Sequence, residues 1–164
     1  MSVRALERAK ETLGDAVTGS HSYRGDETIV VDATRIVEVL SKLRSEVELD
    51  FLVDVTCTDY LGREPRFEMV YHLRSMAHGD RLRVKAPLED PIDGTNPNID
   101  TIVPLWVGAN WLEREVYDLY GINFVGHPDL RRILMYEQFK GHPLRKDYPK
   151  EKRQPLVRRE INEY

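Results

Sequence analysis

The stretch that decides the fold is residues 51–86, FLVDVTCTDYLGREPRFEMVYHLRSMAHGDRLRVKA. Three runs in it alternate apolar and polar residues, at 51–58, 66–73 and 81–86. In the first run Phe51, Val53, Val55 and Cys57 share one side. A period of two with one apolar side predicts strands of a sheet covered on one face. The connections at 62–65 and 75–79 are short, so we expect an antiparallel meander.

Helices are expected on both sides of this stretch. Residues 2–13 place apolar side chains on one helical face, and Gly14 follows as a stop. Two short strands are expected at 16–23 and 28–31, and Asp32 then caps a second helix. The apolar stripe of that helix is Ile36, Val39, Leu40 and Leu43. A third helix is expected from Asn110 as N-cap, with Glu113 completing a capping box, to a stop at Gly121.

The predicted fold class is α+β, an antiparallel or mixed sheet covered by helices with an extended C-terminal tail. Residues 87–104 are rich in proline and glycine and are expected to form a surface loop. One more helical turn is expected beyond Pro128, with Leu130, Ile133 and Leu134. From Gly141 onward the periodicity is lost. The predicted division is therefore an α+β body over residues 1–125 and an extended basic docking tail over residues 126–164.

Charge is distributed unevenly between these two parts. Residues 126–164 hold 10 lysines and arginines against 6 acids, whereas residues 1–125 hold 14 basic and 22 acidic residues. This asymmetry predicts a tail that docks on an acidic neighbour and is mobile before docking, with Arg145, Lys146 and Tyr148 as anchors. Nucleic acid is not expected as a partner, because the basic residues alternate with acids and prolines.

Composition excludes several classes of function. A single cysteine, Cys57, cannot by itself form a disulfide, a cysteine zinc site or an iron–sulfur cluster, so reducing surroundings are the simpler expectation. No apolar run approaches the roughly 20 residues needed to span a bilayer. The first residues contain acids and no apolar core of a signal peptide, so we expect a soluble chain.

The most densely charged stretch is residues 111–132, WLEREVYDLYGINFVGHPDLRR, and GHPLRKDYP follows at 141–149. Their charges stand among aromatic and aliphatic residues, so we expect them to meet partners rather than water. Glu115 and Asp118, three apart on a helix, could perform acid–base chemistry, and His127 and His142 could bind a metal.

We favour a structural role for these groups. In that interpretation the carboxylates pair with arginines, and each imidazole bonds a neighbouring carbonyl or carboxylate. Neither a Gly-x-Gly-x-x-Gly motif nor a P-loop occurs, so a nucleotide site cannot be argued. The expectation is a chain with no catalytic, cofactor-binding or metal-binding residues of its own.

The run Glu113-Arg114-Glu115-Val116-Tyr117-Asp118-Leu119-Tyr120, then six residues, His127, three residues and Arg131-Arg132-Ile133-Leu134, resembles the signature of the 30 kDa subunit family of respiratory complex I. In bacteria this family supplies the C subunit of NADH–quinone oxidoreductase, and GHPLRKDYP is also similar to it. The resemblance implies a peripheral-arm protein without a redox centre. It would pack on the 49 kDa (D) subunit, which contains the quinone site, and near the iron–sulfur subunits.

In this family FMN, the iron–sulfur clusters and quinone belong to partner subunits. The resemblance implies a position on the cytoplasmic side of the bacterial inner membrane, which the chain reaches only through the complex. Two alternatives stay open: the equivalent subunit of a membrane-bound hydrogenase or a ferredoxin- or deazaflavin-dependent dehydrogenase, and an unrelated hydrolase or binding protein. The expected interface or structural residues are Glu113, Arg114, Glu115, Asp118, His127, Asp129, Arg131, Arg132, His142, Arg145, Lys146 and Tyr148.

Overall fold

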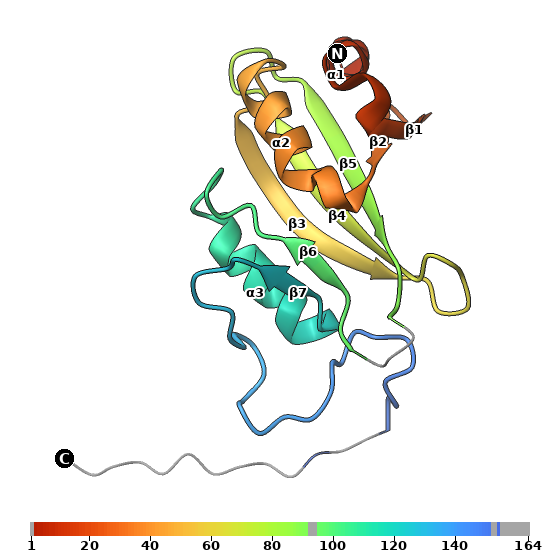
Figure 1. Ribbon diagram of the computed structural model, residues 1–164, viewed down its shortest axis with the longest axis vertical. Coiled ribbons are helices and arrows are strands. Elements are labelled where there is room, and N and C mark those ends of the chain that lie inside the picture. Colours follow the sequence, from red (N-terminus) through yellow and green to blue (C-terminus); the bar gives the residue numbers. More distant parts are fainter. Residues whose placement is uncertain (1, 92–94, 152–153, 155–164) are drawn as a thin grey trace, which may run out of the picture.

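The computed structural model describes residues 2–91, 95–151 and 154. A twisted five-stranded sheet packs against three helices, and the segment after the last strand runs past α3 without regular elements (Figure 1). The sheet and all three helices share one hydrophobic core, whose largest fully buried side chains include Tyr71, Phe67 and Leu40. The predicted α+β class is confirmed.

The sheet has the strand order β1-β2-β5-β4-β3. Its hairpins β1–β2, β3–β4 and β4–β5 are antiparallel, whereas β2 and β5 are parallel. The predicted meander is therefore confirmed, and the parallel contact makes the sheet mixed. The strands are β1 (Val17–Tyr23), β2 (Asp26–Val31), β3 (Phe51–Asp59), β4 (Phe67–Arg74) and β5 (Arg81–Leu88).

The first two helices follow the predicted pattern. α1 spans Ser2–Leu13, and α2 spans Ile36–Ser45. Asp32 caps a short 3-10 turn that leads into α2, since its carboxylate accepts the N–H of Thr34 at 2.8 Å. The predicted apolar stripe of α2 is fully buried, namely Ile36, Val39, Leu40 and Leu43.

One prediction about β3 is wrong. Phe51 and Val53 were expected on the inner side with Val55, but both are 49% exposed. The pairing of β3 with β4 shifts between Leu52 and Asp54. This bulge inserts an extra residue and turns the start of the strand over, so that Phe51 lies opposite Arg74.

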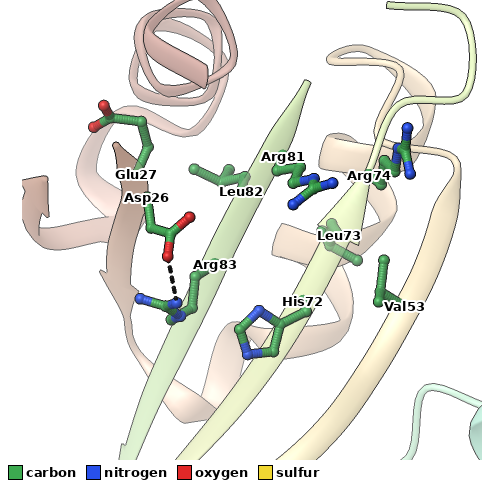
Figure 2. Close-up of a pocket in the computed structure, with 9 residues that line it drawn as sticks. All are labelled: Asp26, Glu27, Val53, His72, Leu73, Arg74, Arg81, Leu82 and Arg83. Atoms are coloured by element: carbon green, nitrogen blue, oxygen red, sulfur yellow. Dashed lines mark hydrogen bonds and ion pairs between the residues drawn. The ribbon is translucent and has the colours of Figure 1, made fainter. Parts of the chain in front are cut away.

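The outer side of the sheet is polar where β4 ends and β5 begins. His72, Arg74, Arg81 and Arg83 extend from these two strands on that side (Figure 2). Their neighbours along each strand, Leu73 and Leu82, are buried in the core. This alternation is what the sequence predicted for a sheet covered on one face.

The third helix, α3, spans Ala109–Tyr120 and ends as predicted at Gly121, which has a left-handed backbone (φ 76°). Its predicted start is wrong: Gly108 occupies the N-cap position, and no side chain in the described part of the chain caps the helix. Glu113 does not complete a capping box, because its carboxylate bonds the loop before the helix. Strand β6 (Asn98–Asp100) precedes α3 in the sequence and strand β7 (Asn123–Val125) follows it. The two strands pair in parallel.

The helical turn predicted beyond Pro128 is also wrong. Residues 126–151 contain turns and bends but neither helix nor strand. The N–H groups of Ile133, Leu134 and Met135 donate to the carboxylate of Asp118 instead of to carbonyls four residues earlier. A side-chain acceptor thus replaces the hydrogen bonds that a helix would have used.

Candidate functional site

Helix α3 directs charged side chains into the protein. Glu115 is exposed, but the other carboxylates of the helix and Arg114 are not. Of the predicted apolar stripe only Val116 is buried, and Leu112, Leu119 and Tyr120 are partly exposed. The prediction that the charges of this segment meet partners rather than water therefore holds within the chain for Glu113, Arg114 and Asp118, but not for the exposed Glu115. The buried residues of α3 are Ala109, Glu113, Arg114, Val116 and Asp118.

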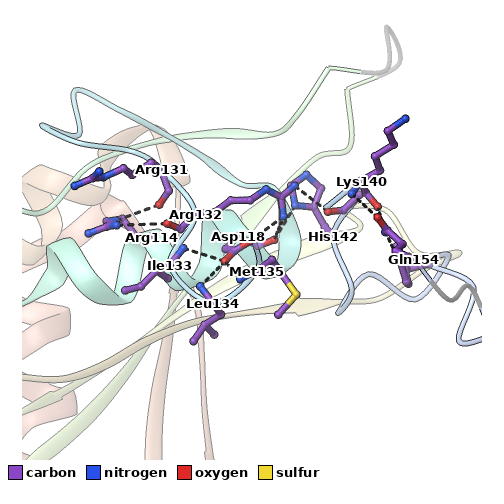
Figure 3. Close-up of polar contacts among 12 residues, drawn as sticks. Arg114, Asp118, Arg131, Arg132, Ile133, Leu134, Met135, Lys140, His142 and Gln154 are labelled. Atoms are coloured by element: carbon purple, nitrogen blue, oxygen red, sulfur yellow. Dashed lines mark hydrogen bonds and ion pairs between the residues drawn. The ribbon is translucent and has the colours of Figure 1, made fainter. Parts of the chain in front are cut away.

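Asp118 is the centre of a polar cluster between α3 and the segment after β7 (Figure 3). Its Oδ2 accepts three consecutive backbone N–H groups, those of Ile133, Leu134 and Met135, at 3.0, 2.7 and 2.8 Å. Its Oδ1 pairs with Arg132 at 2.8 Å. The side chain of Asp118 is 0% exposed and that of Arg132 is 18% exposed. This carboxylate therefore folds the segment after β7 back onto the end of α3.

The environment of Asp118 favours its charged form. Burial alone would raise the pKa of the carboxyl, but the hydrogen bonds from Met135, Leu134 and Ile133 and from Arg132 outweigh it and lower the pKa below 3.8. A carboxylate that is ionised and fully hydrogen-bonded in this way is a poor proton donor or acceptor near neutral pH. Its geometry fits a structural role.

Glu113 lies in a drier environment on the same helix. Its carboxylate accepts the hydroxyl of Thr101 at 2.5 Å and the N–H of Ile102 at 2.7 Å, which ties the preceding loop to α3. Burial raises the pKa of Glu113 to about 7, and the two hydrogen bonds only partly oppose this shift. Tyr71, whose buried hydroxyl has no hydrogen-bond partner among the described residues, interacts electrostatically with Glu113.

His127 lies beside this carboxylate, with its Nε2 3.9 Å from Glu113 Oε2. Its Nδ1 accepts the N–H of Asp129, so Nε2 carries the proton and points to the carbonyl of Asn110 at 3.3 Å. Asp129 in turn pairs with Arg131 at 2.9 Å, and both of these side chains are at least half exposed. Within the chain, the predicted pairing of arginines with the acids of α3 is therefore seen for Arg132 with Asp118, whereas Arg131 pairs with Asp129.

The side chain of Arg114 binds backbone carbonyls of the same segment. Its guanidinium donates to the carbonyls of Arg131 at 3.1 Å and Arg132 at 3.5 Å, and it stacks on the ring of Trp111 at 5.2 Å. Arginine suits this position because its several N–H groups can bond two carbonyls while its flat face covers an aromatic ring.

The segment from Gly141 completes the C-terminal end of α3. The last carbonyls of a helix lack partners within the helix. Here His142 Nδ1 lies 2.9 Å from the carbonyl of Asp118, the N–H of Leu144 donates to Leu119 at 3.1 Å, and Arg145 donates to Tyr120 at 2.5 Å. Burial lowers the pKa of His142, which keeps the imidazole neutral at pH 7.

A second cluster attaches the same segment to the sheet. Arg66 bonds Asp59 through two nitrogens, at 2.9 and 3.0 Å, and it also pairs with Asp147 at 3.0 Å and Asp90 at 2.7 Å. The N–H of Lys146 donates to Asp59 at 2.7 Å. The side chain of Asp59 is 0% exposed, so this cluster is built around a buried carboxylate.

The part of the predicted docking tail that begins at Gly141 thus makes several contacts with the chain's own body. Residues 141–148 bond α3 and the end of β3, and Tyr148 stacks on Phe139 at 5.9 Å and accepts a hydrogen bond from Gln154 at 2.8 Å. Arg145 donates within the chain to Tyr120 and Asn96. Residues 152–153 and 155–164 of the predicted tail lie outside the described residues.

Sequence reasoning missed Asp59, Arg66 and Thr101. A signal for Asp59 was present, since continuing the alternation of Val55 and Cys57 places it on the inner side of the sheet, where a carboxylate needs a partner. Thr101 lies in the breaker-rich loop, where periodicity carries no information. The contact between Asp59 and Arg66 depends on the β3–β4 hairpin and could not be read from spacing alone.

The single cysteine, Cys57, is buried. Burial raises the pKa of the Cys57 thiol to about 12, so this cysteine is not a thiolate nucleophile. In the part of the chain that the structure describes, no three His, Cys, Asp or Glu side chains are grouped as a metal site would need. Within the same residues, no helix has the length and apolar character to cross a membrane.

Comparisons with known proteins agree with this geometry. Residues 29–154 match the family model of the respiratory-chain NADH dehydrogenase 30 kDa subunit. A relative from Citrifermentans bemidjiense is 49% identical over 89% of this chain and 88% of its own length. A relative from Roseiflexus sp. (strain RS-1) is 49% identical over 88% of this chain and 82% of its own length. Both are described as the C subunit of NADH-quinone oxidoreductase.

A solved structure shows the same fold in another complex. A chain of the membrane-bound sulfane sulfur reductase, an archaeal respiratory membrane complex, aligns with a TM-score of 0.73 over 96% of this chain and 97% of that one, at 22% identity. The family match covers both α3 and the segment that Asp118 and Asp59 hold against it. The chain belongs to the family of the 30 kDa subunit of respiratory-chain NADH dehydrogenase.

Proposed function

We propose that this chain is the C subunit of an NADH–quinone oxidoreductase and that it acts in the peripheral arm as a scaffold without a redox centre. In this role it contributes to a complex that passes electrons from NADH to quinone and couples this transfer to ion pumping. The observation that carries the proposal is that the charged family signature is used for internal structure. Asp118, Glu113 and Arg114 each bond the chain's own backbone rather than facing an open cavity.

The proposed partners are the 49 kDa subunit, which contains the quinone site, and the iron–sulfur subunits. The segment that follows β7 supports this, because it bonds α3 through Asp118 and His142 (Figure 3) and the end of β3 through Lys146 and Asp59. A surface fixed in this way loses less conformational entropy on docking than a free tail. The proposed location is the cytoplasmic side of the bacterial inner membrane, with FMN, clusters and quinone in partner subunits.

The alternative is the equivalent subunit of a related respiratory complex with another electron donor, such as a membrane-bound hydrogenase or a ferredoxin- or deazaflavin-dependent dehydrogenase. The structural likeness to a chain of the sulfane sulfur reductase supports only a shared fold. The relatives at 49% identity favour the NADH-dependent complex.

The test is purification of the complex through a tag on this chain. We expect NADH–quinone oxidoreductase activity, flavin and iron to copurify with the tagged chain, and the chain alone to contain neither flavin nor iron in stoichiometric amounts. Asp118→Ala should lower the amount of assembled complex but leave the turnover of each assembled complex unchanged. Normal assembly with selective loss of turnover would indicate a catalytic role for Asp118 instead.

A further inference from the structure

Two neighbouring surface cavities lie outside the clusters around Asp118, Glu113 and Asp59. The first is a cavity of about 350 Å³ on the outer side of the sheet, here called the arginine pocket. Its charged and polar lining consists of Asp26, Glu27, His72, Arg74, Arg81 and Arg83. The second is a cavity of about 330 Å³ at the start of β3, here called the tryptophan groove. It is lined by Phe51, Leu52, Trp106, Val107, Gly108, Trp111 and Leu112.

The arginine pocket has more cations than its own acids can neutralise. Arg74 and Arg81 lie directly opposite each other on β4 and β5, an arrangement in which like charges repel. In the described part of the chain neither of these two arginines has a carboxylate partner. Arg83 pairs with Asp26 at 3.3 Å, while Glu27 is buried and points away from the arginines (Figure 2).

The tryptophan groove exposes large apolar side chains together. Val107 is 84% exposed, Trp111 62% and Phe51 49%, although side chains of this size usually lie in the core. Cations border the groove as well, because Arg44 stacks on the ring of Trp106 at 5.5 Å and Arg114 stacks on the ring of Trp111. Contiguous exposed apolar surface with a polar border is typical of a protein interaction site.

The β3 bulge makes these two features one surface. By turning the start of the strand over, it places Phe51 opposite Arg74, which is itself opposite Arg81. A row of Arg81, Arg74 and Phe51 therefore leads from the arginine pocket into the tryptophan groove. Arginine and tryptophan are among the residue types most enriched at the positions that dominate the binding energy of protein interfaces.

We infer that this row and the two cavities form a docking surface for an acidic segment of a neighbouring subunit that carries a large apolar side chain. The carboxylates of the segment bind Arg74 and Arg81, and the apolar side chain fills the tryptophan groove. This inference rests on the proposed function, because the partner is another subunit of the same complex. Charge complementarity selects an acidic segment, and the exposed aromatic rings select a protein rather than a free anion.

The first experiment identifies the occupant. A benzophenone amino acid replaces Val107, an exposed position at the groove, and native membranes containing the complex are irradiated. We expect one crosslinked peptide from another subunit, in which acidic residues flank a large apolar residue. A crosslink to lipid, to nucleic acid or to a second copy of this chain would overturn the inference. So would the absence of any crosslink, since the groove would then face solvent in the complex.

The second experiment tests the charges. We expect Arg74→Glu with Arg81→Glu to reduce the complex recovered through a tag on this chain at least about tenfold. The matched control is Arg24→Glu with Arg63→Glu, which changes the net charge equally at two exposed arginines elsewhere and should change recovery less than about twofold. Equal recovery of the two double variants would refute the inference.

A single variant separates docking from folding. Arg74→Glu places opposite charges across the strands β4 and β5, so the free chain should keep or raise its melting temperature while recovery of the complex falls. If Arg74→Glu unfolds the free chain and the recovered complex falls as well, this expectation is contradicted. If even the wild-type tagged chain recovers no NADH–quinone oxidoreductase, the proposed function fails. If the wild-type chain recovers the complex and the charge variants recover it equally well, the docking surface is refuted while the proposed function stands.

Discussion

The substitution Asp118→Asn isolates what the buried carboxylate contributes. Asparagine has nearly the same shape, but it replaces one carboxylate oxygen with an amide nitrogen and removes the charge. If the amide oxygen faces the N–H groups of residues 133–135, the amide nitrogen faces the guanidinium of Arg132, which then loses its charged acceptor and keeps only the backbone carbonyls of Gly141 and Asp118. In the other rotamer the three backbone N–H groups lose their acceptor.

The magnitude follows from this geometry. The pair of Asp118 with Arg132 has side-chain exposures of 0% and 18%, and removing one member of a buried pair costs on the order of 3–5 kcal/mol. Most of this cost should appear as local opening, because the segment around residues 132–135 carries no helix or strand and contributes little to the main core. Opening that is easier by about 3 kcal/mol corresponds to roughly 100-fold faster hydrogen exchange.

Hydrogen exchange of the free chain measures the effect directly. The amides of Ile133, Leu134 and Met135 should exchange roughly 100-fold faster in Asp118→Asn than in the wild type, while those in β4 and β5 change much less. Glu115→Gln is the matched control, since it removes one carboxylate charge from the exposed side of the same helix. It should change exchange by less than about threefold.

Two outcomes would refute the reasoning. Unchanged exchange at Ile133, Leu134 and Met135 would mean that Asp118 does not hold the segment. Equal acceleration of these amides and of β4 would mean that the segment and the sheet open as one unit, so that the cost belongs to global rather than local stability.

Three further predictions concern Glu113, Gly121 and Arg66. The folded chain holds a proton on Glu113 up to a pKa of about 7 whereas the unfolded chain releases it near 4.5, so stability should fall as pH rises across this window, by up to about 3 kcal/mol. Glu113→Gln should abolish this dependence, measured by urea unfolding near pH 5 and near pH 8. Gly121→Ala should lower the free energy of unfolding by about 1–3 kcal/mol, seen as a lower melting temperature, because φ is 76° and the new Cβ would lie 2.5 Å from His142 Nε2. Arg66→Ala should cost on the order of 3–5 kcal/mol in urea unfolding, because it leaves the buried carboxylate of Asp59 unpaired. Arg63→Ala, at an exposed neighbouring arginine, should cost less than about 0.5 kcal/mol, and a similar loss in both variants would contradict the assignment for Arg66.

The regular elements could be predicted because the core imposes their periods on the sequence. The stripe of Ile36, Val39, Leu40 and Leu43 and the alternation in β4 and β5 record one buried face each. The β3 bulge could not be predicted in this way. Its apolar residues Phe51 and Val53 continue the alternation without interruption, so the sequence period points inward where the backbone turns outward.

The candidate site was predictable in kind but not in its connections. Mixed charged and aromatic residues indicated that the charges of α3 would be paired, and the structure pairs Asp118 with Arg132. Spacing could not reveal that Asp118 also accepts three N–H groups, because backbone donors leave no mark on residue type. For the same reason Glu113 was expected to cap its own helix, whereas it bonds Ile102 in the loop before it.

The internal contacts of the signature give a structural reason for so specific a motif. Asp118 requires three N–H groups and an arginine at fixed places, so the order of acid, spacer and arginine follows from the shape of one folded segment. The side chains of His142 and Arg145 in this segment in turn donate hydrogen bonds to the last carbonyls of α3. Each side of the contact satisfies polar groups that the other would leave buried and unpaired. A change on either side is therefore costly, and the spacing of the motif follows from the way this segment packs on α3.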